Sequence, residues 1–404
     1  YESRLRRLVH RIKEKIKSWL IRDNIFTVMG FDYVGPVDGH DIEELTEALS
    51  YVRQLHRPVI LHVMTEKGHG YKPAEKDPSL FHGIGAFDPD TGLPLKRSGP
   101  SYPARFSSTL TSLAAHNEKI TAITAAMTSG THLTGFRDSY PERFFDAGIA
   151  EAGAVTMAAG MAKQGLIPVV VIYSSFLQRA YDSLIHDVAL GDLHVVFGVD
   201  HAGIVGEDGE THNGSFDVAY LTSVPHMKIY APASYRELDA MLNKAVNEDT
   251  GPVAIRYPKG SQRNYDGLNL VDTSITTIGR DVTIVSYGTI YANALQAAEI
   301  LNAEGIDAEV IKISTLSPLN TVPILHSVKK TGRLIIAEDA AATGSISEMI
   351  LSHLAGSCEF CHTAINLGDG ILAQGKTEQL EKQLGLDGEG IAQRAKMLLP
   401  QITE

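Results

Sequence analysis

From about residue 106 onward, short apolar runs alternate with longer amphipathic segments, and this alternation limits the folds that the chain can adopt. The runs "KITAITAAM", "IPVVVIYSSF", "LHVVFGVD", "MKIYAP" and "GPVAIRYP" predict buried strands, and segments between them, such as 150–164 and 177–190, predict helices. Strands that alternate with helices form a parallel sheet covered on both faces. The sequence therefore predicts an α/β domain over residues 106–265.

The same alternation restarts after "KGSQRNYDGLN", where "DVTIVSYG", "AEVIKIS" and "RLIIAED" predict strands of a second, smaller α/β domain over residues 275–404. Residues 1–75 contain a loop over 31–40, a helix that begins near His40 or Asp41, and one strand, "RPVILHVMTE". These elements are too few for an independent domain, so we interpret 1–75 as the tail of a larger one. Residues 76–105 are rich in Pro, Gly and Asp and predict a linker.

The charge and hydropathy of the chain exclude some classes of partner. A formal net charge of -12 argues against nucleic acid, which would require a basic face. No apolar run approaches the roughly twenty residues that cross a bilayer, and no signal-peptide pattern is present, so we expect a cytoplasmic protein with no membrane partner. The opening "YESRLRRLVHRIKEKIKSW" predicts a solvated amphipathic helix, with membrane-surface binding as the alternative.

The two cysteines of the chain, Cys358 and Cys361, lie in "CEFCH". This pattern matches both a redox pair and a haem-attachment signature. The sequence around it, "EFCHTAINLG", alternates like a strand and does not open a helix after a turn. The alternation therefore argues against both functions.

Glu151 stands among small apolar residues in "DAGIAEAGAVTMAAG". Burying an ionised carboxylate without a partner is costly, so such a residue has a specific partner or a shifted pKa. A structural ion pair or a carboxylate at a helix start would account for it equally well. The sequence around Glu151 leaves these explanations open.

Ligands of parallel α/β sheets bind beyond the carboxyl ends of the strands, which singles out the loops after Met127, Ile172, Val199 and Ile255. Polar and aromatic side chains follow the last three of these positions: Tyr173, Phe176, Gln178, Arg179, Asp182, His201, Asp208, His212, Arg256 and Lys259. Together with Glu151 and His82 they could line one pocket. No zinc-ligand spacing is convincing, and no Ser or Cys nucleophile has a readable base partner.

Six blocks, in this order, resemble the 1-deoxy-D-xylulose-5-phosphate synthases, a transketolase-like family of thiamine diphosphate enzymes. They are "YVGPVDGHD", "KGHGYKPAEKDPSLFH", "FFDAGIAEAGAV", "YSSFLQRAYDSLIHDVA", "AGIVGEDGETHNGSFD" and "IRYPKG". The resemblance runs from about residue 28 to the C-terminus. It implies a pyrimidine-binding domain over 106–265, a transketolase C-terminal domain over 275–404, and a truncated diphosphate-binding domain before them. The implied reaction joins pyruvate to glyceraldehyde 3-phosphate with loss of carbon dioxide.

The resemblance also implies roles for single residues. Glu151 matches the glutamate that hydrogen-bonds N1′ of the aminopyrimidine, and Phe176 matches the aromatic residue that stacks on that ring. Arg179 and Met127 are expected to contact the cofactor as well. Substrate binding is expected from Tyr173, Arg256 and His201, and proton transfer from His82, Asp208 and His212. Thiamine diphosphate and Mg²⁺ are the implied cofactors, with the metal ligands expected in the missing N-terminal part.

The sequence departs from the family pattern in three places. Ala152 and Gly153 replace a common Gln-His pair, and the glycine-rich turn of the C-terminal domain is altered in "EDAAATGSIS". His201 stands where the family has arginine; because histidine lacks the guanidinium fork and its permanent charge, we expect weaker phosphate binding unless Lys259 or another group compensates.

Three interpretations of the whole chain follow. In the first, the chain is part of a functional synthase that forms a homodimer like its family. The diphosphate-binding half is then lost from the sequence or supplied by a companion polypeptide. The second is a non-catalytic remnant that serves as a binding or assembly module. The third is a β-type subunit of a split transketolase or of a 2-oxo-acid dehydrogenase, which the blocks "GIVGEDGETHNG" and "FLQRAYD" disfavour.

Overall fold

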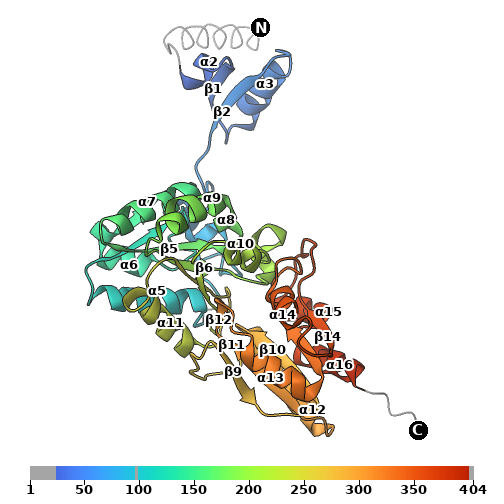
Figure 1. Cartoon of the computed structure of the whole chain (residues 1–404). Helices are drawn as coiled ribbons and strands as arrows, with labels where there is room; N and C mark the ends of the chain where they lie inside the picture. Colours follow the sequence, from blue (N-terminus) through green and yellow to red (C-terminus); the bar gives the residue numbers. More distant parts are fainter. Residues whose placement is uncertain (1–23, 96–98, 400–404) are drawn as a thin grey trace, which may run out of the picture. The chain divides into compact units, whose positions relative to one another are not determined.

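The computed structural model describes residues 24–95 and 99–399, and each of these two ranges forms a compact unit (Figure 1). The amphipathic helix predicted at the start of the chain lies outside the described residues. Within the described ranges, no helix has both the length and the apolar character needed to span a bilayer.

The first unit is a small βαβ arrangement followed by short helical turns. Strands β1 and β2 pair in parallel, and α3 connects them. Helix α3 begins after Asp41, whose side chain accepts hydrogen bonds from the backbone N–H groups of Glu43 and Glu44, each at 3.0 Å. The elements are α2 (Ile25–Val28), β1 (Asp32–Asp38), α3 (Ile42–Val52), β2 (Val59–Met64), α4 (Lys72–Lys76) and a 3₁₀ turn (Leu80–His82).

The predicted loop over 31–40 is wrong, because most of it forms β1. Its residues pair with β2 from Asp32 to Asp38, and the register shifts between Val34 and Val37. Pro36 lies in this irregular stretch, and proline cannot donate a hydrogen bond to a neighbouring strand. The Gly-Pro pair therefore concealed a strand from the sequence pattern.

The second unit contains a seven-stranded sheet in the order β12-β7-β8-β6-β5-β3-β4. All neighbouring pairs are parallel except β12 and β7. This confirms the predicted parallel α/β fold, with one antiparallel strand added at the edge. The strands are β3 (Ile120–Thr124), β4 (Phe144–Asp146), β5 (Ile167–Tyr173), β6 (Val196–Asp200), β7 (Lys228–Tyr230), β8 (Val253–Arg256) and β12 (Thr315–Ser317).

Helices cover both faces of this sheet, as Figure 1 shows for α5 and α11 on one side and α7 on the other. Along β5, Val169 and Val171 pack with α5 and α11, whereas Val170 and Ile172 pack with α7. This alternation gives each face its own apolar layer. The helices are α5 (Tyr102–Ala114), α6 (Thr134–Ser139), α7 (Glu151–Lys163), α8 (Ser174–Leu177), α9 (Tyr181–Ser183), α10 (Asp217–Thr222) and α11 (Tyr235–Asn247).

The single helix predicted over 177–190 is wrong in detail. This stretch divides into a 3₁₀ turn (Gln178–Ala180), α9, a π-helical turn (Leu184–Val188) and a second 3₁₀ turn (Ala189–Gly191). Most of its apolar residues still face the core, including Leu184 and Val188, whereas Leu190 is exposed. The apolar spacing was therefore visible in the sequence, while the breaks in the hydrogen-bond ladder were not. Irregular turns of this kind are frequent at functional sites.

A second sheet of five strands follows in the order β14-β13-β10-β11-β9, in which β9 alone is antiparallel to its neighbour. The predicted strand character around "CEFCH" is confirmed, because β14 begins at Cys361; both cysteines are free. The elements are β9 (Thr273–Thr277), β10 (Val282–Tyr287), α12 (Ile290–Ala303), β11 (Ala308–Ile313), α13 (Val322–Thr331), β13 (Arg333–Ala337), α14 (Ile346–Leu354), β14 (Cys361–Ile365), α15 (Thr377–Leu384) and α16 (Gly388–Leu398).

The two sheets of the second unit are joined by strand and side-chain contacts. Strand β12, which follows β11 of the second sheet, pairs with β7 of the first. Beside this junction, Lys312 Nζ lies 2.8 Å from Glu237 Oε1, and both side chains are fully buried. One apolar core continues across the junction through Ile229 and Leu316.

We expect replacement of Ser234 by Ala to lower the free energy of unfolding by about 0.5–2 kcal/mol, because Ser234 caps α11. Its Oγ accepts the N–H of Glu237 at 3.2 Å and donates to the carbonyl of Gly267 at 2.6 Å. Urea unfolding would measure the loss. The matched control is Ser112→Ala in the exposed part of α5, where alanine favours the helix; equal losses in both variants would contradict the capping role.

Candidate active site

Four rings gather beyond the carboxyl ends of β5 and β6. The ring of Tyr173 stacks on that of His201 with centroids 3.8 Å apart and planes at 19°. Phe176 lies 5.6 Å from Tyr173, also stacked, and His212 meets Phe176 edge-on at 5.3 Å. The structure thus brings together four residues that the sequence placed on two separate loops. Parallel strand ends impose this proximity, since successive loops emerge at the same edge of the sheet.

His201 is held by a carboxylate that the sequence argument did not include. Asp200 Oδ1 accepts hydrogen bonds from the backbone N–H of His201 at 2.7 Å and pairs with its Nδ1 at 2.8 Å. The backbone of His201 has φ +58, an uncommon conformation for a non-glycine residue. Complete burial raises the pKa of Asp200, against the lowering effect of His201. The position of Asp200 as the last residue of a predicted strand was the available signal for it.

Asp208 lies between His201 and Lys259. Its Oδ2 is 3.7 Å from His201 Nε2, and its Oδ1 pairs with Lys259 Nζ. The Lys259 side chain is 45% exposed and that of Asp208 is 26% exposed, so water reaches this pair. An ion pair with such exposure contributes about 0–1 kcal/mol.

Arg256, by contrast, is enclosed by carboxylates. Its Nε lies 2.9 Å from Asp217 Oδ2, and its Nη1 lies 2.9 Å from Asp339 Oδ1. Its side chain is 3% exposed. Burial alone would lower the pKa of Arg256, but Asp217 and Asp339 overcome this and raise it well above its usual value. The guanidinium therefore remains charged.

An aromatic ring completes the surroundings of Arg256. Its guanidinium carbon lies 5.4 Å from the centroid of Tyr287, whose hydroxyl donates to Glu338 at 2.9 Å. Glu338 is buried and also accepts the backbone N–H groups that open α14. Glu338 and Asp339 both come from "EDAAATGSIS", the segment that departs from the family pattern. No local sequence signal indicated that Asp339 would reach Arg256, or that Glu338 would reach Tyr287 beside it.

Glu151 is 5% exposed and is the first residue of α7. Its Oε1 lies 3.2 Å from Nη1 of Arg179, whose side chain is 63% exposed. Both of the structural explanations considered for Glu151 are therefore present, a helix start and an ion pair. The partner is largely solvated, so the pair only partly compensates the buried carboxylate. A ring nitrogen that shares a proton with Glu151 would satisfy it further.

The loop after Met127 lies against Tyr173. Met127 is partly buried against the core, and its carbonyl accepts hydrogen bonds from the backbone and side chain of Thr131 at 2.9 and 2.8 Å. A Cβ atom at Gly130 would lie 2.3 Å from the Tyr173 hydroxyl, so glycine permits this close approach. The loop that follows Met127 thus approaches the ring cluster at Gly130.

His82 belongs to the first unit, where it ends a 3₁₀ turn and its Nδ1 lies 3.1 Å from Lys67 Nζ. Its role toward the substrate stays a prediction. Across the described ranges, no group of three or more His, Cys, Asp or Glu side chains is arranged to hold a metal ion.

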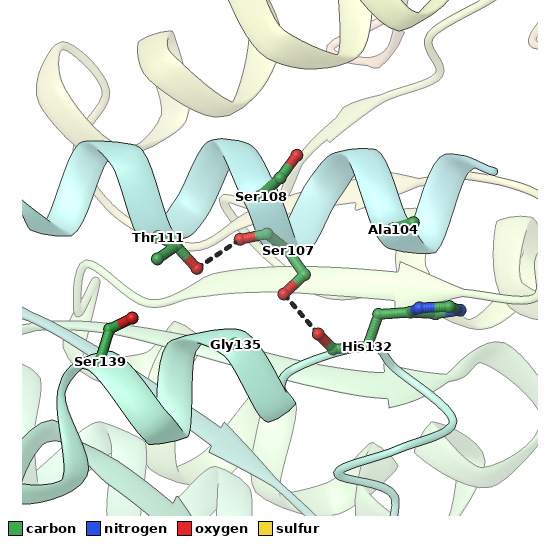
Figure 2. Close-up of a pocket in the computed structure, with 7 residues that line it drawn as sticks. All are labelled: Ala104, Ser107, Ser108, Thr111, His132, Gly135 and Ser139. Atoms are coloured by element: carbon green, nitrogen blue, oxygen red, sulfur yellow. Dashed lines mark hydrogen bonds between the residues drawn. The ribbon is translucent and has the colours of Figure 1, made fainter. Parts of the chain in front are cut away.

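A separate hollow of about 370 Å³ lies between α5 and α6 (Figure 2). Two of its hydroxyl groups are engaged within the protein: Ser107 Oγ donates to the carbonyl of His132 at 2.7 Å, and Thr111 Oγ1 donates to the carbonyl of Ser107 at 2.7 Å. None of the predicted site residues lines it. Its lining is Ala104, Ser107, Ser108, Thr111, His132, Gly135 and Ser139.

We expect Gly203→Ala to disturb the Arg256 network. Gly203 has φ +74, and a Cβ there would lie 2.1 Å from Asp339 Oδ2. The matched control is Gly305→Ala, with φ +81 and no atom within 4 Å of the added carbon. The control should cost about 1–2 kcal/mol through its backbone conformation alone. Urea unfolding should show a clearly larger loss in the free energy of unfolding for Gly203→Ala than for Gly305→Ala. Equal losses would show that the Asp339 side chain can move aside at no cost.

Comparisons with known proteins agree with this fold. Residues 98–264 match the family "Transketolase, pyrimidine binding domain", and residues 272–391 match "Transketolase, C-terminal domain". Residues 1–65 match the family described as "1-deoxy-D-xylulose-5-phosphate synthase". Among solved structures, a "Split gene transketolase, inactive beta4 tetramer" superposes with a TM-score of 0.67 at 27% identity, covering 74% of this chain and 99% of that one.

The second unit is therefore a transketolase-type pair of α/β domains. Curated relatives include 1-deoxy-D-xylulose-5-phosphate synthase 1 of Geobacter sulfurreducens, 44% identical over 96% of this chain and 62% of the relative. The synthase of Clostridium acetobutylicum is 42% identical over 96% and 63%, respectively. The chain belongs to the 1-deoxy-D-xylulose-5-phosphate synthase family. It spans less than two thirds of the length of these relatives.

Proposed function

We propose that this chain forms the pyrimidine-binding and acceptor-binding part of a 1-deoxy-D-xylulose-5-phosphate synthase. The observation that carries the proposal is the joint placement of Tyr173, Phe176, His201 and His212 in one ring cluster at the carboxyl edge of the sheet. The identity of 42–44% to relatives bearing that name supports the same reaction. The reaction would join pyruvate to glyceraldehyde 3-phosphate with release of carbon dioxide.

Bound thiamine diphosphate would supply the carbon nucleophile and the electron sink for this chemistry. Glu151 would hold a proton at N1′ of the aminopyrimidine, since its carboxylate is buried and its only ion-pair partner among the described residues is the exposed Arg179. Phe176 would stack on the pyrimidine, and Met127 would approach the ring from the neighbouring loop. These residues fit the pyrimidine half of the cofactor.

The remaining predicted residues would act on the substrates. Tyr173, His201 and Arg256 would bind the acceptor substrate. Asp208 and His212, with His82, would transfer protons. We propose that the diphosphate and Mg²⁺ are held by a segment that a companion polypeptide or a longer form of this chain supplies. We also propose a homodimer, a state compatible with large exposed apolar side chains such as Ile149 and Leu190.

The test is product formation from pyruvate and glyceraldehyde 3-phosphate with thiamine diphosphate and Mg²⁺. The chain would be assayed alone and together with a polypeptide that carries a diphosphate-binding segment of the family. Deoxyxylulose phosphate in the second assay would support the proposal. No product in either assay, and no magnesium-dependent binding of thiamine diphosphate, would favour a non-catalytic assembly module.

A further inference from the structure

The loop 203–214 carries Asp208 and His212, yet its own backbone does little to fix their position. Its helical elements are two short 3₁₀ turns. Three of its glycines have positive φ: Gly203, Gly206 and Gly209. Glycine loses more conformational freedom on folding than any other residue, so a glycine-rich loop is costly to order. A single position for Asp208 and His212 therefore requires contacts that hold the loop.

Asn213 supplies such contacts from within the loop. Its side chain is buried, and its Oδ1 accepts the backbone N–H of Val205 at 3.1 Å. Its Nδ2 donates to the carbonyl of Gly209 at 3.4 Å. The backbones of Gly203 and Gly214 exchange two hydrogen bonds, at 3.0 and 2.8 Å. Asn213 thus ties the start of the loop to its middle, beside a backbone pair that closes its ends.

The C-terminal domain contacts the same loop from outside, through the segment that precedes α15. Gln374 Nε2 donates to the carbonyl of Glu207 at 2.8 Å, directly before Asp208 in the chain. The carbonyl of Leu372 accepts a hydrogen bond from Asn213 Nδ2 at 3.5 Å. The internal tie and the external contact therefore meet at one side chain.

Close packing accompanies these hydrogen bonds. A Cβ atom at Gly206 would lie 2.8 Å from the carbonyl oxygen of Gly375 and 2.8 Å from Thr377 Oγ1. Just beyond the end of the loop, the carbonyl of Ser215 accepts the backbone N–H of Ala341 at 2.7 Å. The C-terminal domain thus contacts the loop in its middle and next to its end.

We propose that the C-terminal domain holds the loop 203–214 in the position that proton transfer requires, with Gln374 and Asn213 as positioning residues. Both side chains act through the loop backbone and not on the reacting atoms. The contacts matter because a misplacement of about 1 Å can lower a rate by about 100-fold. This inference rests on the proposed function, which assigns proton transfer to Asp208 and His212, and it gives the C-terminal domain a part in that step.

Hydrogen–deuterium exchange of the full chain, measured by mass spectrometry on peptides that cover residues 203–214, tests the positioning without cofactor. We expect Gln374→Ala to speed exchange there by about 2- to 10-fold, the usual effect of one hydrogen bond. Asn213→Ala should speed it more, because the buried N–H of Val205 then lacks its acceptor. Gln374→Lys keeps a donor for the Glu207 carbonyl and should retain wild-type exchange.

Turnover of the assembled enzyme provides the second measurement. Gln374→Ala should lower kcat by about 2- to 10-fold and leave the KM for pyruvate and for glyceraldehyde 3-phosphate unchanged, since it changes no substrate contact. Gln374→Lys should restore kcat. The matched control is Gln379→Ala, at an exposed position of α15, which should change neither exchange nor kcat.

Wild-type exchange over residues 203–214 in both Gln374→Ala and Asn213→Ala would overturn the inference. Faster exchange of the loop with an unchanged kcat would also overturn it, because the position of the loop would then not affect turnover. Equal acceleration throughout the chain would do the same, since it indicates general destabilisation. The exchange measurement needs neither thiamine diphosphate nor product. A chain that forms no product but shows the loop-specific effect would therefore reject the proposed function and keep the loop contacts.

Discussion

Replacement of Glu151 by Gln should lower turnover of the assembled enzyme by about 10²- to 10⁴-fold, the usual contribution of a positioned acid–base group. Glutamine fills the same space, yet it cannot carry the negative charge that holds a proton at a ring nitrogen. Glu151 is buried at the start of α7, and its ion pair with Arg179 is solvated on one side. We therefore expect the loss of turnover to result from the missing charge and not from unfolding of α7.

Two measurements separate these explanations. The rate of deuterium exchange at the thiazolium C2 of bound cofactor, followed by nuclear magnetic resonance, should fall together with turnover. Urea unfolding of the variant should stay close to that of the wild type. Glu142→Gln, at an exposed position on a 3₁₀ turn, serves as the control and should change neither quantity. Full turnover in Glu151→Gln would remove the basis for its assignment.

The second large effect concerns stability. Arg256→Met should lower the free energy of unfolding by about 3–5 kcal/mol, because it leaves buried Asp217 and Asp339 without their cation. The control, Arg280→Met, breaks a pair with Asp307 whose side chains are 78% and 40% exposed, and should cost at most about 1 kcal/mol. Urea unfolding followed by circular dichroism would measure both variants.

A further test of the same network removes the negative charges of Asp217 and Asp339, which Arg256→Met leaves unpaired. Adding Asp217→Asn and Asp339→Asn to Arg256→Met should recover part of the lost stability, since the amides carry no charge to be desolvated. A loss in Arg256→Met no greater than in Arg280→Met would show that water reaches the network. A deeper loss in the triple variant would show that hydrogen-bond geometry, and not charge, dominates.

The sequence predicted most of the strands and helices that consist of strongly apolar runs. The strands β5, β10 and β13 and the helix α7 coincide with the predicted segments, because each is a buried element whose length and composition are set locally. Strand β1 was missed because Gly35 and Pro36 interrupt its pattern. The breaks within 177–190 were missed because a local change from α-helical to 3₁₀ or π-helical hydrogen bonding leaves the apolar spacing in the sequence unchanged.

The candidate site was predictable only in part. Tyr173, Phe176 and His201 were indicated by the strand-end rule and the family resemblance, and the structure places their rings in contact distance. The partner that Arg256 finds in Asp339 was not indicated in the same way. Asp339 lies 83 residues from Arg256 along the chain, so only the three-dimensional fold reveals their pairing.

Strand β12 has a consequence for how this polypeptide can be divided. The pyrimidine-binding domain and the C-terminal domain match separate families with a gap between residues 264 and 272, yet the outermost strand of the first sheet comes from the second domain. Separating the domains at that gap would remove β12, the outer neighbour of β7, and leave an open strand edge, the kind of surface that promotes aggregation. The two family domains are thus one folding unit, and gene fission, domain shuffling or a chimeric exchange would have to carry both together.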